Sequence, residues 1–219
     1  MMNRKFPVKR YLLLITVILL LPNIIIAQTD YKYELYVNGG FGAPYFPKYL
    51  DDNWQWGFNG GIGLGYRLSP QWLIEGSADL YTFNFDAPEF YARLPQTAYI
   101  TTAEGKMSNI AGLSANVRYF INLFAEDTFL YFMGGMGAQR IFIGSIKVLY
   151  QDYAIGLVDE DYLESKINYG FQMHFATGFD IISTAKRSYF GEIRYTVGFL
   201  SDYNSHVLAL KLGLRQSLW

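Results

Sequence analysis

Residues 167–181 read INYGFQMHFATGFDI, and this stretch decides the fold. Large apolar side chains occupy almost every second position: Ile167, Tyr169, Phe171, Met173, Phe175, Phe179 and Ile181. The positions between them are polar or small: Asn168, Gly170, Gln172, His174, Gly178 and Asp180. Successive side chains of a β-strand point to opposite faces, so the stretch predicts a strand with one apolar face and one polar face.

Seven further segments alternate in the same way: 33–41, 56–68, 72–83, 107–121, 129–139, 189–199 and 208–214. Seven of the eight segments run to nine to fifteen residues, and a tilted strand needs about 9–11 residues to cross a bilayer. An open sheet edge inside hydrocarbon would leave backbone groups unpaired, so the strands must close on one another. The sequence therefore predicts an all-β protein, a transmembrane antiparallel up-and-down barrel of eight strands.

The connections between these segments alternate in length. The long ones span 43–53, 86–105 and 145–166, and the short ones span 69–71, 122–127 and 183–187. Barrels of the outer membrane have long loops outside the cell and short turns in the periplasm. Only the connection 201–204 departs from this order, because it is short although it falls outside. The strands on either side of the connection 145–166 could also continue above the membrane and form a hairpin.

The composition favours a membrane barrel over a soluble sandwich. The chain has 19 Tyr, 17 Phe, four Trp and 21 Gly, with only 17% charged residues. A soluble β-sandwich normally carries more charge on its outer faces. Cysteine is absent, which excludes disulfides and thiolate metal sites.

The first 27 residues have the layout of an export signal. Basic residues at the start precede an apolar run over 11–21, and Ile25 and Ala27 occupy the −3 and −1 positions of a cleavage site. We expect a cleaved signal peptide over 1–27 and a mature barrel over 28–219; a retained anchor over 11–26 is the alternative. The signal removes basic residues only, so the mature chain is acidic and no nucleic-acid partner is expected.

Ten charged residues fall on the inward face of the predicted strands. They are Glu34, Arg67, Glu75, Asp79, Arg118, Asp180, Glu192, Arg194, Lys211 and Arg215. An eight-stranded barrel is just wide enough for side chains to fill it, and buried charges must be paired. We therefore expect a salt-bridge plug in the periplasmic half of the lumen, with a gated ion path as the alternative.

The inward residues of the other half are neutral and often small. A shallow cavity open to the outside would be lined by Asn38, Asn59, Tyr81, Gln139, Asn168, Gln172 and Thr196. The alternative is close packing of glycines around large aromatic rings.

The sequence predicts no enzyme, metal site or cofactor. His174 faces inward, where we expect it to be hydrogen bonded. Ser205 and His206 are adjacent in the last strand, so they point to opposite faces and oppose a direct Ser–His hydrogen bond. The acidic loop around Asp159 and Glu164 lacks the spacing of a calcium loop.

Residues 28–219 resemble the OmpA-like and OmpX-like family of small Gram-negative outer-membrane barrels. The resemblance lies in the pattern, which ends on alternating Leu210, Leu212 and Leu214 and a terminal Trp219. Gln216 interrupts the alternation, and a bulge near Gln216 or Ser217 would restore the phase. The resemblance implies the cell outer membrane, contact with its lipid and insertion by the barrel-assembly machinery.

The expected function is a non-enzymatic structural or interaction role through the extracellular loops, with the lumen plugged by salt bridges. The partner would be an extracellular or membrane protein. Three alternatives stay open at this point: a narrow channel or small-ligand uptake protein, an accessory subunit of a secretion or uptake machine, and a lipid-modifying barrel enzyme.

Overall fold

A computed structural model describes residues 32–46, 53–93, 100–122, 127–152, 157–184 and 186–218. The predicted signal peptide, 1–27, and the terminal Trp219 lie outside these ranges.

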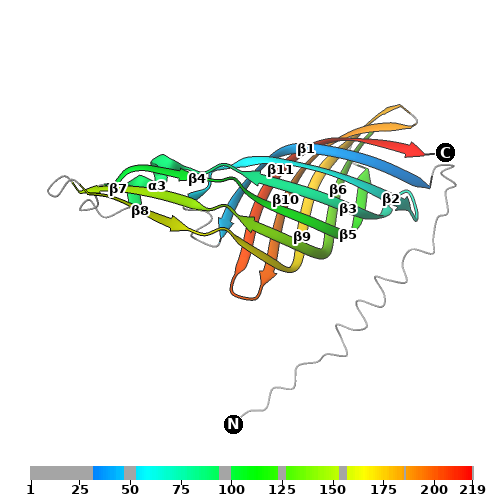
Figure 1. The fold of residues 1–219 in the computed structure, drawn as a ribbon. Coiled ribbons are helices and arrows are strands. Elements are labelled where there is room, and N and C mark those ends of the chain that lie inside the picture. Colours follow the sequence, from blue (N-terminus) through cyan, green and yellow to red (C-terminus); the bar gives the residue numbers. More distant parts are fainter. Residues whose placement is uncertain are drawn as a thin grey trace, which may run out of the picture.

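Eight strands form one closed antiparallel barrel, as the alternation predicts. Their bounds are β1 Tyr33–Phe46, β2 Gly57–Arg67, β3 Trp72–Phe83, β5 Ser108–Asn122, β6 Thr128–Ile143, β9 Lys166–Thr184, β10 Arg187–Leu200 and β11 Asn204–Leu218. Each of these strands pairs with its neighbour in the chain, and β1 pairs with β11 to close the wall (Figure 1). The predicted eight-stranded barrel is therefore confirmed.

Alternate residues of each strand face out of the barrel and into it. In β9, Phe175 is 61% exposed while its neighbour His174 is 1% exposed. The exposed set is dominated by leucine, isoleucine, phenylalanine and tyrosine, and the charged residues of the spanning strands lie mostly inside. Apolar side chains thus face outward and charged side chains face inward, which is the reverse of a soluble protein and suits a wall that contacts lipid.

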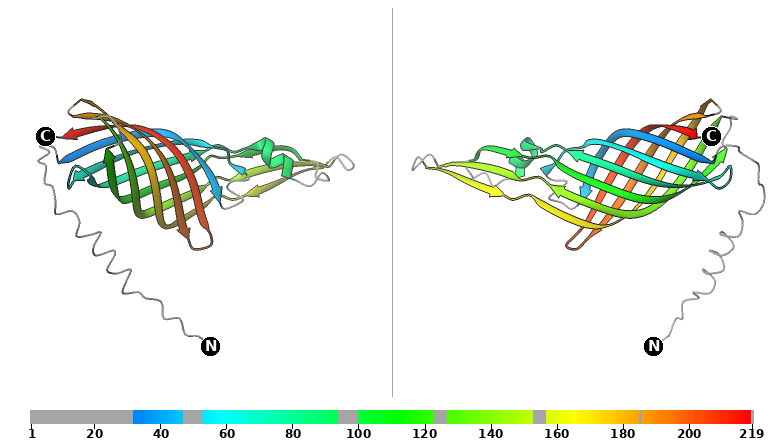
Figure 2. Two further views of the ribbon diagram at one scale, coloured as in Figure 1. Left: turned by 180° about the vertical axis from the view of Figure 1, so that it is seen from behind. Right: turned by 45° about the vertical axis from the view of Figure 1, so that its right-hand side comes forward.

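The two ends of the barrel differ. The start of β1 and the end of β11 lie at one end, together with the short connections β2–β3, β5–β6 and β9–β10; we call it the turn end. The opposite end, the loop end, carries an extension that projects beyond the barrel (Figure 2). The extension consists of helix α3 (Ala87–Arg93) and a three-stranded sheet of β4 (Ile100–Gly105), β7 (Ile146–Asp152) and β8 (Leu157–Leu163).

Local chemistry explains the elements that form within two of the long connections. Asp86 precedes α3 and accepts a hydrogen bond at its Oδ1 from the backbone N–H of Glu89, at 3.1 Å, which caps the helix. Ile146 and Val148 lie on either side of Lys147 in β7 and are both buried. Within 145–166, β7 and β8 pair antiparallel, which agrees with the prediction that the strands could continue above the membrane as a hairpin.

The last strand contradicts the predicted bulge. β11 pairs with β1 without interruption from the Ala43–Leu208 pair to the Tyr33–Leu218 pair, and the only register shift lies at the other end, between Pro44 and Phe46. Gln216 simply occupies an outward position, where its Oε1 accepts a hydrogen bond from Arg187 Nε at 2.8 Å. A polar residue near the strand end is tolerated without any change of phase.

Candidate functional site in the barrel interior

The structure places all ten predicted lumen charges inside the barrel. They come from seven strands, β1, β2, β3, β5, β9, β10 and β11, each from the inward phase of its strand. Arg67, at the turn end, has a side chain that is 17% exposed. The other nine have side chains of which 6% or less is exposed.

Arg118 forms the centre of the first ion-pair group. Its Nη2 lies 3.1 Å from Glu75 Oε1 and 3.4 Å from Glu192 Oε2. The guanidinium carbon also lies 4.1 Å from the centre of the Tyr131 ring, which is a cation–π contact. The Tyr131 hydroxyl donates to Glu192 Oε2 at 3.0 Å, so one arginine and one phenol share the same carboxylate.

Glu192 links this group to a second one around Asp79. Arg194 Nε donates to Glu192 Oε1 at 2.7 Å, and Arg194 Nη1 donates to Asp79 Oδ2 at 2.8 Å. Lys211 Nζ donates to the other oxygen of Asp79, at 2.5 Å. A continuous chain of ion pairs therefore crosses the lumen from Arg118 to Lys211.

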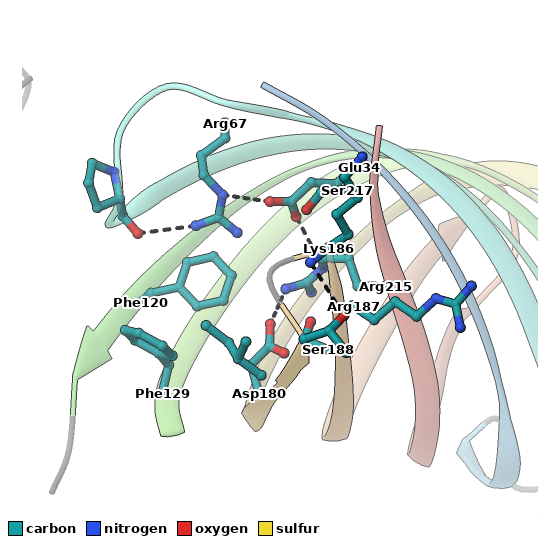
Figure 3. Close-up of a pocket in the computed structure, with 13 residues that line it drawn as sticks. Glu34, Arg67, Phe120, Phe129, Asp180, Lys186, Arg187, Ser188, Arg215 and Ser217 are labelled. Atoms are coloured by element: carbon teal, nitrogen blue, oxygen red, sulfur yellow. Dashed lines mark hydrogen bonds and ion pairs between the residues drawn. The ribbon is translucent and has the colours of Figure 1, made fainter. Parts of the chain in front are cut away.

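The third group lies at the turn end and is drawn in Figure 3. Arg67 Nε donates to Glu34 Oε1 at 2.5 Å, and Arg215 Nε lies 3.3 Å from Glu34 Oε2. Arg215 also donates through Nη1 to Asp180 Oδ2. Glu34 and Asp180 together hold two arginines across the mouth of the barrel.

These contacts fill the half of the lumen toward the turn end with paired charges. Aromatic and aliphatic residues pack around them, among them Tyr36, Leu73, Phe120 and Phe190, all buried. Truncating one partner would leave a buried charge without its counter-charge, which is expensive in a low dielectric. The arrangement is suited to closing the lumen, because a moving ion would have to break these pairs.

The neutral residues of the other half lie mostly in a packed interior. Asn59, Tyr81, Gln139, Gln172 and Thr196 are buried. Gln139 Nε2 donates to Ser205 Oγ at 3.1 Å, and Asn168 Nδ2 donates to the Tyr203 hydroxyl at 2.8 Å. The side-chain amides of Asn38 and Asn59 have no hydrogen-bond partner among the described residues.

An apolar cluster at the loop end lies where the sequence predicts a cavity open to the outside. Its buried members are Trp54, Tyr81, Phe83, Ile110, Ile141, Ile143, Ile146, Val148, Val207 and Ala209. We call it the apolar cap. Tyr81, one of the predicted cavity residues, belongs to this cluster. Asn38 and Gln139, two others, border a cavity of about 730 Å³. Ligand binding by those residues stays a prediction.

A signal for the cap is present in the sequence. Ile141, Phe142 and Ile143 are consecutive apolar residues, so both faces of β6 are apolar where the strand leaves the alternating pattern. A strand that is apolar on both faces is buried on both, which would have indicated packing rather than a cavity.

The two histidines are engaged separately. His174 Nε2 lies 2.7 Å from Asn116 Oδ1 inside the lumen, which is the hydrogen-bonded position that the sequence predicts. His206 Nδ1 lies 2.5 Å from the Tyr195 hydroxyl on the outer side of the wall, whereas Ser205 is buried inside. Ser205 and His206 thus point to opposite faces, and neither contact assembles a nucleophile with its base.

Within the described ranges, no set of three or more histidine, cysteine, aspartate or glutamate side chains has the geometry to hold a metal ion. No helix in those ranges is both long and apolar enough to cross a membrane.

Comparison with known proteins agrees with this architecture. The family model described as outer membrane protein beta-barrel domain matches residues 16–215. The chain belongs to this family. Members of the family lie in the cell outer membrane, so the turn end faces the periplasm, the loop end faces outward and the exposed apolar wall contacts lipid.

Several solved structures match the chain at low sequence identity. Neisserial surface protein A is 12% identical, with a TM-score of 0.54, over 85% of this chain and 97% of that one. Ail, the attachment invasion locus protein of Yersinia pestis, is 17% identical, with a TM-score of 0.47, over 84% and 98% of the two chains. The β-barrel domain of Pseudomonas aeruginosa OprF is 11% identical, with a TM-score of 0.43, over 83% and 96%. No curated protein matches the sequence.

Proposed function

We propose that this protein is a non-enzymatic barrel that acts at the cell surface through its extension. Its lumen is closed and does not conduct ions. The observation that carries the proposal is that buried side chains cross the lumen at two levels. Ion pairs around Arg118 and Asp79 occupy the periplasmic half, and the apolar cap occupies the extracellular half.

The extension is suited to presenting a fixed surface. The apolar cap runs from lumen residues such as Ile110 into Ile146 and Val148 of β7, and Phe90 of α3 packs against it. Trp54 Nε1 donates to the carbonyl oxygen of Lys106 at 3.1 Å, which ties a second connection to the same core. A surface that is ordered before binding avoids the entropic cost of ordering it on contact.

Exposed side chains on the extension point to a protein partner outside the cell. Tyr162 is 50% exposed and Leu163 is 53% exposed on β8, and the acidic Glu160, Asp161 and Glu164 lie exposed beside them. Aromatic side chains at a surface commonly mark a contact with a partner, and the acidic rim favours a partner with basic residues.

Electrical recording tests the closed lumen. The purified protein, inserted into planar bilayers, should show no stable openings in symmetrical potassium chloride. A variant with Arg118→Ala and Asp79→Ala should stay closed as well, because the apolar cap still blocks the extracellular half. Stable openings of the unaltered protein would favour the channel alternative instead.

Photo-crosslinking on intact cells tests the surface role. A photoreactive amino acid at position 162 should give adducts to a protein outside the barrel. The same group at Leu212, on the lipid-facing wall, is the matched control and should give none. Adducts of equal yield from both positions would count against a surface contact.

The proposal also includes export by a cleaved signal over residues 1–27. Sequencing the N-terminus of the protein purified from outer membranes should start at Gln28. A start at residue 1 would support the retained anchor.

A further inference from the structure

A pocket opens at the periplasmic mouth, below the third ion-pair group (Figure 3). Its volume is about 220 Å³. The lining residues are Glu34, Arg67, Pro70, Phe120, Phe129, Asp180, Ile182, Thr184, Lys186, Arg187, Ser188, Arg215 and Ser217. The closed-lumen proposal makes no use of this space.

The pocket contains a buried arginine whose donors are not all used. The Arg215 side chain is 2% exposed, and its Nη2 finds no hydrogen-bond acceptor in the described part of the chain. A buried guanidinium nitrogen without an acceptor is costly, so an acceptor from a ligand or from water is expected there.

Arg67 places a second guanidinium beside the first. Its Nε is held by Glu34 and its Nη1 by the Pro70 carbonyl oxygen, at 3.1 Å. Its guanidinium carbon lies 4.9 Å from the centre of the Phe120 ring, and that of Arg215 lies 5.4 Å from the same ring. The Phe120 ring therefore contributes an apolar surface to the pocket and lies close to both guanidinium groups.

The charge of the lining is positive. Arg187 donates to Gln216 on the outward face, so three basic residues (Arg67, Lys186 and Arg215) and two acidic ones face the pocket, which leaves a surplus of one positive charge. Lys186 lies in the connection between β9 and β10, and Arg187 is the first residue of β10. Figure 3 shows the Arg187 side chain extending away from Arg67. Ser188 and Ser217 add two hydroxyl groups to the wall.

We propose that this pocket binds a phosphate group. Paired guanidinium groups match the geometry of phosphate oxygens, and the positive surplus of the lining favours an anionic group. Phe120 and Phe129 would contact the organic part of the ligand. The phosphate belongs either to a soluble ester in the periplasm or to a phospholipid headgroup of the inner leaflet.

Titration with glycerol 3-phosphate tests the proposal in detergent micelles that contain no phospholipid. The ³¹P resonance of the ligand should broaden and shift with the unaltered protein. Arg67→Gln should weaken binding about tenfold, because a charge-assisted hydrogen bond is lost. Arg67 lies at the mouth and Glu34 keeps Arg215, so this variant should fold; Lys186→Gln at the rim should weaken binding about threefold.

The matched control is Arg140→Gln, an exposed arginine of β6 near the loop end. It removes the same charge from the opposite end of the barrel and should leave binding unchanged. Absence of binding, binding that Arg67→Gln does not weaken, or equal weakening by Arg140→Gln would each overturn the proposal and leave the pocket as a hydrated mouth.

Phospholipid nanodiscs separate the two sources of phosphate. If the ligand is soluble, glycerol 3-phosphate should bind in nanodiscs as it does in micelles. If a headgroup occupies the pocket, the soluble ester should no longer bind in nanodiscs. A shifted lipid ³¹P signal should then appear with the unaltered protein and vanish with Arg67→Gln. Either pattern supports a phosphate site.

Discussion

The two halves of the lumen are closed by opposite chemistry. In β11, Lys211 is buried against Asp79 in the periplasmic half, while Val207, four residues earlier in the same strand, is buried in the apolar cap. Ion pairs are strong only where water is excluded, and an apolar cluster excludes water. We therefore expect the cap to shield the ion pairs from water on the extracellular side.

The largest effect is expected from breaking the ionic half. Arg118→Met keeps most of the side-chain volume but leaves Glu75 and Glu192 without their shared cation. Loss of one partner of a buried ion pair costs about 3–5 kcal/mol. The free energy of unfolding, from urea titration in micelles followed by tryptophan fluorescence, should fall by that amount.

Arg140→Met is the control for Arg118→Met, because Arg140 is exposed. It should leave the unfolding midpoint within error of the unaltered protein. A loss below about 1 kcal/mol for Arg118→Met would mean that water reaches Glu75 and Glu192, and the comparison between a dry ionic half and its cap would fail.

The apolar half should show a smaller loss. Ile141 is fully buried in the cap, and replacing it with alanine removes apolar contacts and leaves a cavity. Such truncations cost about 2–5 kcal/mol, and a cap near the barrel rim should fall at the lower end because it can relax. The same urea titration measures the loss.

Met107→Ala is the matched control for Ile141→Ala, because Met107 lies at the same end of the barrel but is 59% exposed. Its effect should be well below that of Ile141→Ala. Equal losses from the two variants would show that the cap is not tightly packed.

The faces of the strands were predictable and the contacts across the lumen were not. Alternation assigns a residue to a face because backbone geometry alone decides it, and His174 and Phe175 follow that rule. Ion-pair partners depend on register and strand tilt: Arg194 meets Asp79 across 115 positions of sequence, and no local pattern encodes that.

The sheet of the extension could not be predicted from the sequence, for a related reason. Its sheet brings β4 against β7, from two connections that are separated by two barrel strands. Long-range pairing of short strands leaves little periodic signal, so only the hairpin of β7 and β8 was available as an alternative.

Close packing within the ionic half gives the third test. A Cβ atom at Gly63 would lie 2.2 Å from the Tyr36 ring, whose hydroxyl donates to Glu75 Oε1 at 3.2 Å. Gly63→Ala must push this ring, and overpacking of this kind costs about 1–3 kcal/mol. Gly76→Ala is the control, because a Cβ there meets nothing within 4 Å on the outward face. If both variants unfold at the same urea concentration, the side chains around Tyr36 in the lumen are not closely packed.

The smallest effect should come from an ion pair outside the barrel. Lys147 Nζ lies 2.7 Å from Glu160 Oε1, and their side chains are 40% and 52% exposed. The hydrogen bond to Glu160, followed by its charge, raises the pKa of the Lys147 ammonium, so any stabilisation is present at neutral pH and is lost as the pH rises through that pKa. Solvent screens the pair, however, and exposed pairs stabilise little.

Lys147→Gln should therefore leave the unfolding midpoint unchanged at pH 7. The unfolding midpoints of the two proteins should also change with pH in the same way from pH 8 to pH 11, because the other titrating groups of the chain set that dependence. A midpoint at pH 7 that drops as far as it does in Arg118→Met would show that exposure does not separate the two kinds of ion pair. The contrast between a dry lumen and a solvated extension would then have to be abandoned.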